Sequence, residues 1–229
     1  MEVIDRIPVA LDPAAVAERL RHNPTRASSI DLDGLLAQAR SLIRLRAVAG
    51  ISFTGAKTED TVVIDGVTFR SRVLRRNLDR AQKVFPFVVT AGPDLERAAS
   101  SSGDLLSQYY LEEMANVALE NAAAWLAGRL GTRWGFPSLA SMDPGSLEDW
   151  PITEQPKLFS LLGDTERLIG VRLTDSMLML PRKSISGIFF PSEEGFTSCR
   201  LCERAACPGR RTPYDPAVAA KYERGGGAA

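Results

Sequence analysis

The fold class follows from one stretch of ten residues, Thr61-Val62-Val63-Ile64-Asp65-Gly66-Val67-Thr68-Phe69-Arg70. The residues on both sides of Asp65-Gly66 repeat with a period of two, and this dipeptide is favoured in two-residue type I′ turns. A connection of two residues can join only antiparallel strands. The stretch therefore predicts a β-hairpin and, with it, antiparallel pairing in the sheet.

Helical and strand patterns follow each other irregularly on either side of this hairpin. Helical spacing is expected after Asp12-Pro13, from Asp31 towards Gly50, and over Val73–Ala81, Leu105–Leu126 and Leu158–Leu162. Further strands are expected over Val84–Ala91, Leu168–Leu173 and Ile185–Phe190. Because there is no regular βα alternation, the sequence predicts an α+β fold with helices packed on a largely antiparallel or mixed, twisted sheet.

The longest expected helix, over Leu105–Leu126, has one apolar face and one polar face by its spacing. The residues expected to face the core are Leu106, Tyr110, Met114, Val117, Asn121 and Trp125. Those expected on the solvated side are Gln108, Glu112, Glu113, Asn116 and Glu120.

Composition excludes two classes of partner. The chain has 229 residues, of which 45% are hydrophobic, so it can build a large core. Lys and Arg together number 28, as do Asp and Glu, and a neutral chain does not coat nucleic acid by bulk charge. Its longest apolar stretches, such as Val84–Ala91, are far too short to cross a bilayer. We therefore expect no nucleic-acid partner and no membrane association.

Histidine and cysteine usage limits the chemistry further. His22 is the only histidine, so a His-rich metal site is excluded, and a Ser/His/Asp or Cys/His arrangement would have to use it. The number of cysteines is odd, and Met1–Arg6 does not begin an apolar secretory segment. These features predict a soluble protein of the reducing cytoplasm, where free thiols bind metals or act in redox chemistry.

The three cysteines, Cys199, Cys202 and Cys207, lie within nine residues of one another. A Cys-x-x-Cys places two thiolates on one turn, and a third can occupy another corner of a tetrahedral site. From Cys199 to Arg224 there are six basic and three acidic residues, a local charge of +3 that favours thiolates. We interpret this segment as a zinc or iron–sulfur site that takes its fourth ligand from elsewhere. A reversible disulfide and three ordinary thiols are the alternatives.

A second candidate lies in the irregular stretch Thr132–Pro156, which is too long for an ordinary connection. Within it, Pro144-Gly145 predicts a turn that a ligand can approach closely, and Trp150 offers a face for stacking. Three acidic residues could accept hydrogen bonds from an amine or a ribose: Asp143, Glu148 and Asp149. An inert loop is the alternative.

A third candidate is Arg182-Lys183, which two serines follow, Ser184 and Ser186. This group could hold a carboxylate or a phosphate, and a solvated turn is the alternative.

The chain resembles the C-terminal activation domain of cobalamin-dependent methionine synthase, and more closely the short free-standing proteins of that family. Two passages carry most of the resemblance: Pro144-Gly145 with Trp150-Pro151 and Gln155, and Leu173-Thr174 with Ser176, Met179, Pro181, Ser184-Ile185-Ser186-Gly187 and Phe189-Phe190. A weaker passage runs from Thr90 to Glu96 and on to Tyr109–Glu112. Together they cover roughly Leu35 to Phe190.

This resemblance implies a domain that binds S-adenosylmethionine (AdoMet) and docks on a cobalamin-carrying partner. In the family, a corrinoid methyltransferase that has lost an electron regains activity by reduction coupled to methylation from AdoMet. The activation domain supplies AdoMet and helps to hold the partner in the reactivating arrangement. The chain is therefore expected to be an accessory protein for reductive reactivation of a cobalamin- or corrinoid-dependent methyltransferase.

Carried over by residue, the resemblance places AdoMet at Pro144, Gly145 and Ser146, with Arg133 ahead of the turn. Ser146 stands where the family has tyrosine. The synthase domain also lacks the cysteine-rich segment, whereas short relatives share its Cys-x-x-Cys…Cys-Pro-Gly-Arg-Arg pattern. We thus expect an activation-domain-like part over 1–196, a metal- or cluster-binding segment over 197–224 and a disordered tail over 225–229.

Two other functions fit the same residues. A metal-stabilised module that binds the corrinoid protein without AdoMet is favoured by Ser146, because the missing ring removes a stacking group. A small methyltransferase is the other alternative, although the residues offer few groups for acid–base catalysis.

Overall fold

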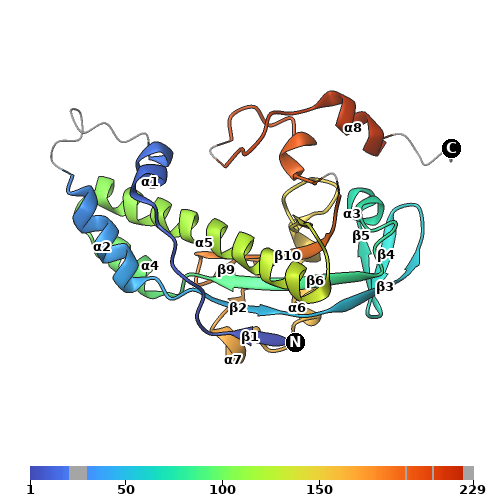
Figure 1. Ribbon diagram of the computed structural model, residues 1–229, viewed down its shortest axis with the longest axis horizontal. Coiled ribbons are helices and arrows are strands. Elements are labelled where there is room, and N and C mark those ends of the chain that lie inside the picture. The colour runs from blue at the N-terminus through green and yellow to red at the C-terminus, as the bar shows by residue number, and fades with distance from the viewer. Residues whose placement is uncertain (21–29, 194, 208, 224–229) are drawn as a thin grey trace. The chain divides into compact units, whose positions relative to one another are not determined.

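The computed structural model describes residues 1–20, 30–193, 195–207 and 209–223 (Figure 1). His22 and the predicted disordered tail, 225–229, lie outside these residues. The described chain has helices and a largely antiparallel sheet, which confirms the expected α+β class.

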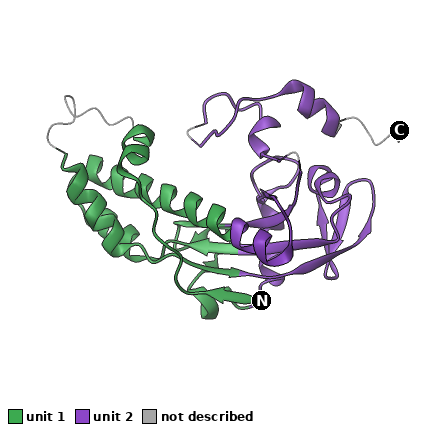
Figure 2. Cartoon of the chain, in the orientation of Figure 1, with its two compact units in different colours: residues 1–48, 88–126, 164–185 green, residues 49–87, 127–163, 186–229 purple. Residues whose placement is uncertain are grey.

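The chain divides into two compact units, and neither is continuous in sequence (Figure 2). The first contains residues 1–48, 88–126 and 164–185, and the second contains residues 49–87, 127–163 and 186–229. Two long strands, β6 (Lys83–Thr90) and β10 (Ser184–Pro191), begin in one unit and end in the other. The predicted boundary between 1–196 and 197–224 stays a prediction.

The first unit has the strand order β1-β2-β6 and a β8-β9 hairpin. Its remaining elements are β1 (Glu2–Ile4), α1 (Pro13–Arg19), α2 (Leu32–Leu42), β2 (Arg46–Ala49), α4 (Asp94–Ser100), the first part of α5 (Leu105–Trp134), α7 (Thr165–Ile169), β8 (Arg172–Leu173) and β9 (Met179–Leu180).

The second unit has the strand order β6-β3-β4-β5, and its β10 pairs with both β6 and β7. Its remaining elements are β3 (Ser52–Lys57), β4 (Thr61–Ile64), β5 (Val67–Arg70), α3 (Arg72–Asn77), β7 (Leu139–Met142), the 3-10 turn η1 (Ile152–Glu154), α6 (Gln155–Ser160), the 3-10 turn η2 (Ser198–Arg200) and α8 (Pro216–Glu223).

The predicted hairpin is present as β4 and β5. Asp65 and Gly66 have φ angles of 44° and 82°, the two positive values that a type I′ turn requires. Ile64 pairs with Val67 across the turn. The inward side chains of the hairpin, Val62, Ile64 and Phe69, are fully buried in the core of the second unit.

Aspartates begin the helices where the sequence suggested caps. The Asp12 carboxylate accepts a hydrogen bond from the Ala15 amide (2.9 Å), and the Asp31 carboxylate accepts one from the Gly34 amide (2.8 Å). Each bond satisfies an amide that has no partner inside its helix.

Two element predictions are wrong. The helix after Asp31 ends at Leu42, well before Gly50, because Ala47, Val48 and Ala49 are all buried in strand β2. The expected strand over Leu168–Leu173 begins instead as helix α7, which Asp164 caps and which Gly170 ends with a φ of 75°. In both cases a short apolar run fitted either structure, and tertiary pairing decided between them.

The stretch Thr132–Pro156 is more ordered than expected. Helix α5 continues to Trp134, strand β7 follows, and η1 begins at Ile152. Two irregular parts remain, residues 135–138 and the loop from Asp143 to Pro151 that follows β7.

Arg182 and Lys183 already hold carboxylates of the protein itself, within the first unit. Arg182 pairs with Glu96 at 2.5 Å and with Glu112 at 3.6 Å, and Lys183 pairs with Glu112 at 3.7 Å. The Lys183 ammonium also donates to the Asn116 amide oxygen (3.2 Å). These contacts join the two residues just before β10 to helices α4 and α5, a structural role for the predicted anion-binding residues.

No helix among the described residues combines the length and the apolar character needed to span a membrane.

Candidate functional site

Asp143, Pro144, Gly145 and Ser146 form a β-turn at the end of strand β7. The Ser146 amide donates to the Asp143 carbonyl (3.1 Å), and Gly145 has a φ of 85°. Proline at the second position and a residue of positive φ at the third define a type II turn. Gly145 is exposed, and its amide donates to the Trp150 carbonyl (2.7 Å). The predicted turn is present, and close approach of a ligand to it stays a prediction.

The Asp143 carboxylate lies directly over the backbone of Gly187 in β10. Met142 of β7 pairs with Ile188 of β10, which places Asp143 beside Gly187. A Cβ atom at position 187 would lie 2.1 Å from Asp143 Oδ1 and 2.9 Å from the Met142 carbonyl oxygen. Only glycine leaves room for this carboxylate, so two separate passages of the family resemblance meet here.

Burial raises the pKa of Asp143 to about 6, and the positive charge of Arg211 acts in the opposite direction. The residue as a whole is half-buried. It is therefore a carboxylate largely surrounded by protein atoms.

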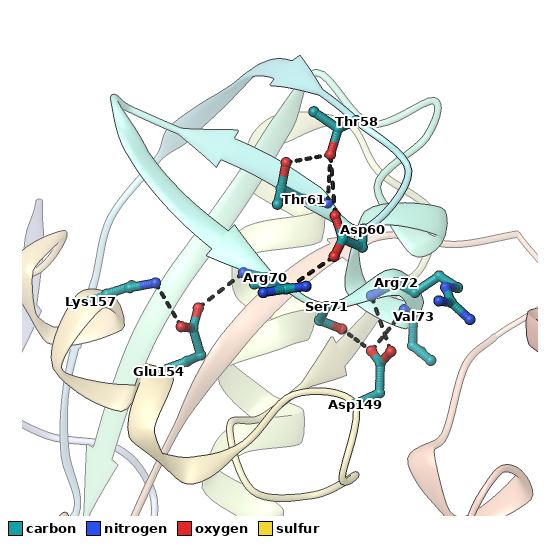
Figure 3. Close-up of polar contacts among 10 residues, drawn as sticks. All are labelled: Thr58, Asp60, Thr61, Arg70, Ser71, Arg72, Val73, Asp149, Glu154 and Lys157. Atoms are coloured by element: carbon teal, nitrogen blue, oxygen red, sulfur yellow. Dashed lines mark hydrogen bonds and ion pairs between the residues drawn. The ribbon is translucent and has the colours of Figure 1, made fainter.

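Asp149 binds the start of helix α3. Its carboxylate accepts hydrogen bonds from the Ser71 hydroxyl, the Arg72 amide (3.2 Å) and the Val73 amide (2.9 Å), as Figure 3 shows. These bonds are structural, and they occupy the oxygens that the sequence offered to a ligand.

Trp150 is also structural. Its side chain is fully buried in the core of the second unit and packs edge-on against Phe69, with ring centroids 6.1 Å apart. The expectation that it offers a stacking face to a ligand is wrong, because the hairpin covers the ring.

Asp149 lies beside a depression of about 360 Å³ whose polar groups are largely engaged with each other (Figure 3). Glu154 accepts from the Arg70 amide (3.0 Å) and from the Lys157 ammonium (2.6 Å), and Asp60 pairs with the Arg70 guanidinium (2.9 Å). These contacts fasten η1 and α6 to the hairpin. None of the lining residues belongs to the predicted AdoMet site.

Arg133 lies in the last turn of α5, where its guanidinium is 5.8 Å from the centroid of the Trp134 ring. Pro144, Gly145 and Ser146 belong to the turn after β7. Arg133 contacts the Trp134 ring of its own helix. Its part in AdoMet binding stays a prediction.

The cysteine-rich segment is folded around Arg210. Its guanidinium donates to four backbone carbonyls, those of Cys199 (3.2 Å), Thr212 (3.2 Å), Cys202 (3.0 Å) and Arg204 (2.5 Å). The pKa of Cys199 is affected in two directions. Burial raises it. Hydrogen bonds from the Arg211 and Thr212 amides and the Thr197 hydroxyl, together with the charge of Arg210, lower it by more, so the pKa of this thiol lies below its ordinary value.

The described residues do not form a ready metal site. No three histidine, cysteine or acidic side chains converge closely enough within the described ranges to hold an ion. Cys199 Sγ instead accepts a hydrogen bond from the Arg211 amide (3.5 Å). Metal or cluster binding by Cys199, Cys202 and Cys207 stays a prediction that this arrangement does not fit.

The cysteine-rich segment does reach the predicted AdoMet turn. The Ser146 hydroxyl donates to the Asp143 carbonyl (2.7 Å) and lies 3.2 Å from the Ser198 hydroxyl. Arg211, thirteen residues beyond Ser198, is the cation that acts on Asp143. The sequence did not predict this proximity, because no local pattern at 143–146 or at 198–211 indicates that the two segments lie close together.

The family model for the activation domain of vitamin B12-dependent methionine synthase matches residues 73–197. The chain belongs to this family. The match includes the Asp143–Ser146 turn and Gly187 and ends just before Cys199, so the cysteine-rich segment lies outside the activation-domain pattern. Membership supports a role in the reactivation of a cobalamin-dependent enzyme.

A crystal structure of the MetH reactivation domain bound to AdoHcy is similar in fold. The likeness covers 83% of this chain and 70% of that one, with a TM-score of 0.53 and 19% sequence identity. Comparison with curated protein sequences gives no match. The family and the fold that the resemblance implied are thus both confirmed for this activation-domain chain.

Proposed function

We propose that this chain is an accessory protein for the reductive reactivation of a cobalamin- or corrinoid-dependent methyltransferase. It binds AdoMet at the Asp143–Ser146 turn, docks on the corrinoid-carrying protein and acts in the cytoplasm. When bound, AdoMet supplies the methyl group that the partner's reduced corrinoid accepts. The chain's own part is to bind AdoMet and to orient it.

One observation carries the proposal. Within the family match, a type II turn presents the exposed Gly145 backbone beside the deeply set Asp143 carboxylate. Exposed backbone carbonyls and a carboxylate can accept hydrogen bonds from a nucleoside that carries an amino-acid group. The AdoHcy bound by the MetH reactivation domain has this chemistry, which supports the same ligand class here.

The test is calorimetric titration of AdoMet and AdoHcy into the full chain and into two glycine variants. Gly145→Ala and Gly66→Ala both place a side chain at a positive φ, so each should cost about 1 kcal/mol of stability. Only Gly145→Ala should weaken nucleoside binding, because a Cβ there presses on Ile152 at 3.1 Å and alters the turn.

The functional assay follows the absorbance of a corrinoid methyltransferase in its inactive, one-electron-oxidised form, with a low-potential chemical reductant and AdoMet. We expect the chain to accelerate recovery and Gly145→Ala to slow it. Partner binding without AdoMet binding would overturn the AdoMet part of the proposal. It would favour a docking module that acts without AdoMet, an alternative consistent with the Ser146–Ser198 contact.

A further inference from the structure

The two cysteines of the Cys-x-x-Cys motif lie on one tight turn. Three successive backbone hydrogen bonds of the i to i+3 kind build it, from the Arg200 amide to the Thr197 carbonyl (3.1 Å), from Leu201 to Ser198 (3.1 Å) and from Cys202 to Cys199 (3.4 Å). In 3-10 geometry, side chains three residues apart lie on the same side of the turn. Cys199 and Cys202 therefore share one side of this turn.

The spacing of the turn fits a disulfide. A hydrogen bond from i to i+3 holds the first and fourth Cα atoms within about 7 Å, and disulfides join Cα atoms about 4.4–6.8 Å apart. All three cysteines are free thiols and half-buried, which leaves each of them partly open to small reagents. Cys207 lies on a separate turn, where its carbonyl accepts from the Arg210 amide (3.1 Å). The backbone thus favours Cys202 over Cys207 as the partner of Cys199.

The residues between the two cysteines fasten the turn to the protein. The Arg200 guanidinium pairs with the Asp215 carboxylate (2.8 Å), and the Arg200 carbonyl accepts from the Asp215 amide (3.0 Å). Leu201 packs against the core of the second unit. The Arg210 guanidinium also donates to the carbonyls of both cysteines (3.2 and 3.0 Å). The turn is therefore held by bonds that do not use its sulfur atoms, so both thiols remain available for exchange.

Cys199 is placed to react first. The Arg211 amide donates to its Sγ (3.5 Å), and the Arg210 guanidinium donates to its carbonyl. A donor on the sulfur and a positive charge nearby favour the thiolate, which is the form of cysteine that attacks a disulfide.

We propose that Cys199 and Cys202 form a redox-active dithiol that exchanges with low-molecular-weight disulfides. The Cys199 thiolate attacks one sulfur of the small disulfide, whose S–S bond breaks as one small thiolate leaves. Cys202, after losing its proton to water, attacks the Cys199 sulfur of the mixed disulfide and releases the second small thiolate. The two cysteines are oxidised to a disulfide, and the small disulfide is reduced to two thiols.

This inference goes beyond the proposed function and does not depend on AdoMet binding. The dithiol lies next to Ser198, whose hydroxyl is 3.2 Å from that of Ser146 in the proposed AdoMet turn. It belongs to the C-terminal segment that lies beyond the family match.

The experiment incubates the full, reduced chain without oxygen in mixtures of reduced and oxidised glutathione. Alkylation and peptide mass spectrometry then identify the products. We expect the unaltered chain to form one intramolecular disulfide, between Cys199 and Cys202. Cys207→Ser is the matched control and should form the same disulfide at the same glutathione ratio. Cys202→Ser should stop at a mixed disulfide between glutathione and Cys199, formed at least tenfold faster than any on Cys207.

Two results would overturn the inference. One is a disulfide that includes Cys207, or mixed disulfides alone in the unaltered chain. The other is zinc or iron that elemental analysis finds in the purified chain and that only denaturation releases from all three thiols, since this would assign them to a metal site. If Cys202→Ser fails to fold, the unaltered chain and Cys207→Ser still decide. Either result leaves AdoMet binding to be judged by the glycine variants, so the two failures are distinguishable.

Discussion

The absence of a side chain at Gly187 makes room for the Asp143 carboxylate and so affects its pKa. A Cβ at position 187 would overlap Asp143 Oδ1, so the carboxylate can lie deep in the protein only because Gly187 has no side chain. Burial then raises the pKa of Asp143 to about 6, against the charge of Arg211. The chain keeps an acidic group where burial makes its charge unfavourable, which is common for groups that bind a ligand.

Asp143→Asn should make stability less dependent on pH. The folded pKa lies above the unfolded one, so the folded chain binds this proton more tightly and the carboxylate lowers stability above pH 6. As the pH falls from 7.5 to 5, the unfolding free energy of the unaltered chain should gain about 1 kcal/mol from this group. Among the described residues, Arg211 is the charged group that acts on it.

Urea unfolding at the two pH values measures this effect. Asp143→Asn should be more stable than the unaltered chain at pH 7.5, and the difference should shrink at pH 5. Glu148→Gln, on the exposed side of the loop, should show no such trend. An equal difference at both pH values would mean that the Asp143 proton is not involved.

Helix α3 depends on a residue far away in sequence. It has only six residues, too few to be stable alone, and its own cap is the Ser71 hydroxyl, which accepts from the Leu74 amide (2.9 Å). Asp149 adds bonds to the Arg72 and Val73 amides and to Ser71 itself. The loop after β7 therefore stabilises the helix after β5.

Asp149→Ala should lower the free energy of unfolding by about 1–2 kcal/mol, because two amides and a hydroxyl lose their acceptor near the surface. Glu148→Ala is the control and should change it by less than about 0.5 kcal/mol. Denaturant unfolding compares the two variants. Equal stabilities would mean that water replaces the Asp149 carboxylate at no cost.

The buried face of α5 agrees only in part with the one that its spacing predicted. Leu106 is 40% exposed and Asn121 is also exposed. Tyr110 and Met114 are buried as predicted. The other buried residues of this stretch are Leu111, Ala115, Ala118, Leu119, Ala122 and Leu126, which the predicted face did not include. Alanines carry little weight in a hydrophobic pattern, yet they allow close packing of neighbouring elements. Glu112 and Glu113 are half-buried because they pair with Arg182 and Arg19.

The chain as a whole carries no net charge, with 28 basic and 28 acidic residues. Long-range attraction to a charged partner is therefore weak, and the proposed docking on a corrinoid-carrying protein is expected to rest on local contacts. The affinity for the corrinoid-carrying protein should change by less than about threefold between 50 and 500 mM salt. A steep loss of affinity with salt would assign docking to a charged patch, for which the +3 segment from Cys199 is the first candidate.

The sequence by itself determined those features of this protein that depend only on residues close together along the chain. The hairpin, the Asp12 and Asp31 caps and the Pro144-Gly145 turn follow from local backbone preferences, which act over a few residues. The α+β class and the family follow from such elements and from two short motifs.

Only the tertiary structure decided what each side chain of the candidate site does. It buried Trp150 under the hairpin, engaged Asp149 with α3 and left Asp143 over Gly187 in the field of Arg211. Burial and charge are set by all the atoms around a group, and here those atoms come from segments more than forty residues away in sequence. A local pattern cannot contain that information, so the sequence could indicate the loop and its three acidic residues but not which of them is buried.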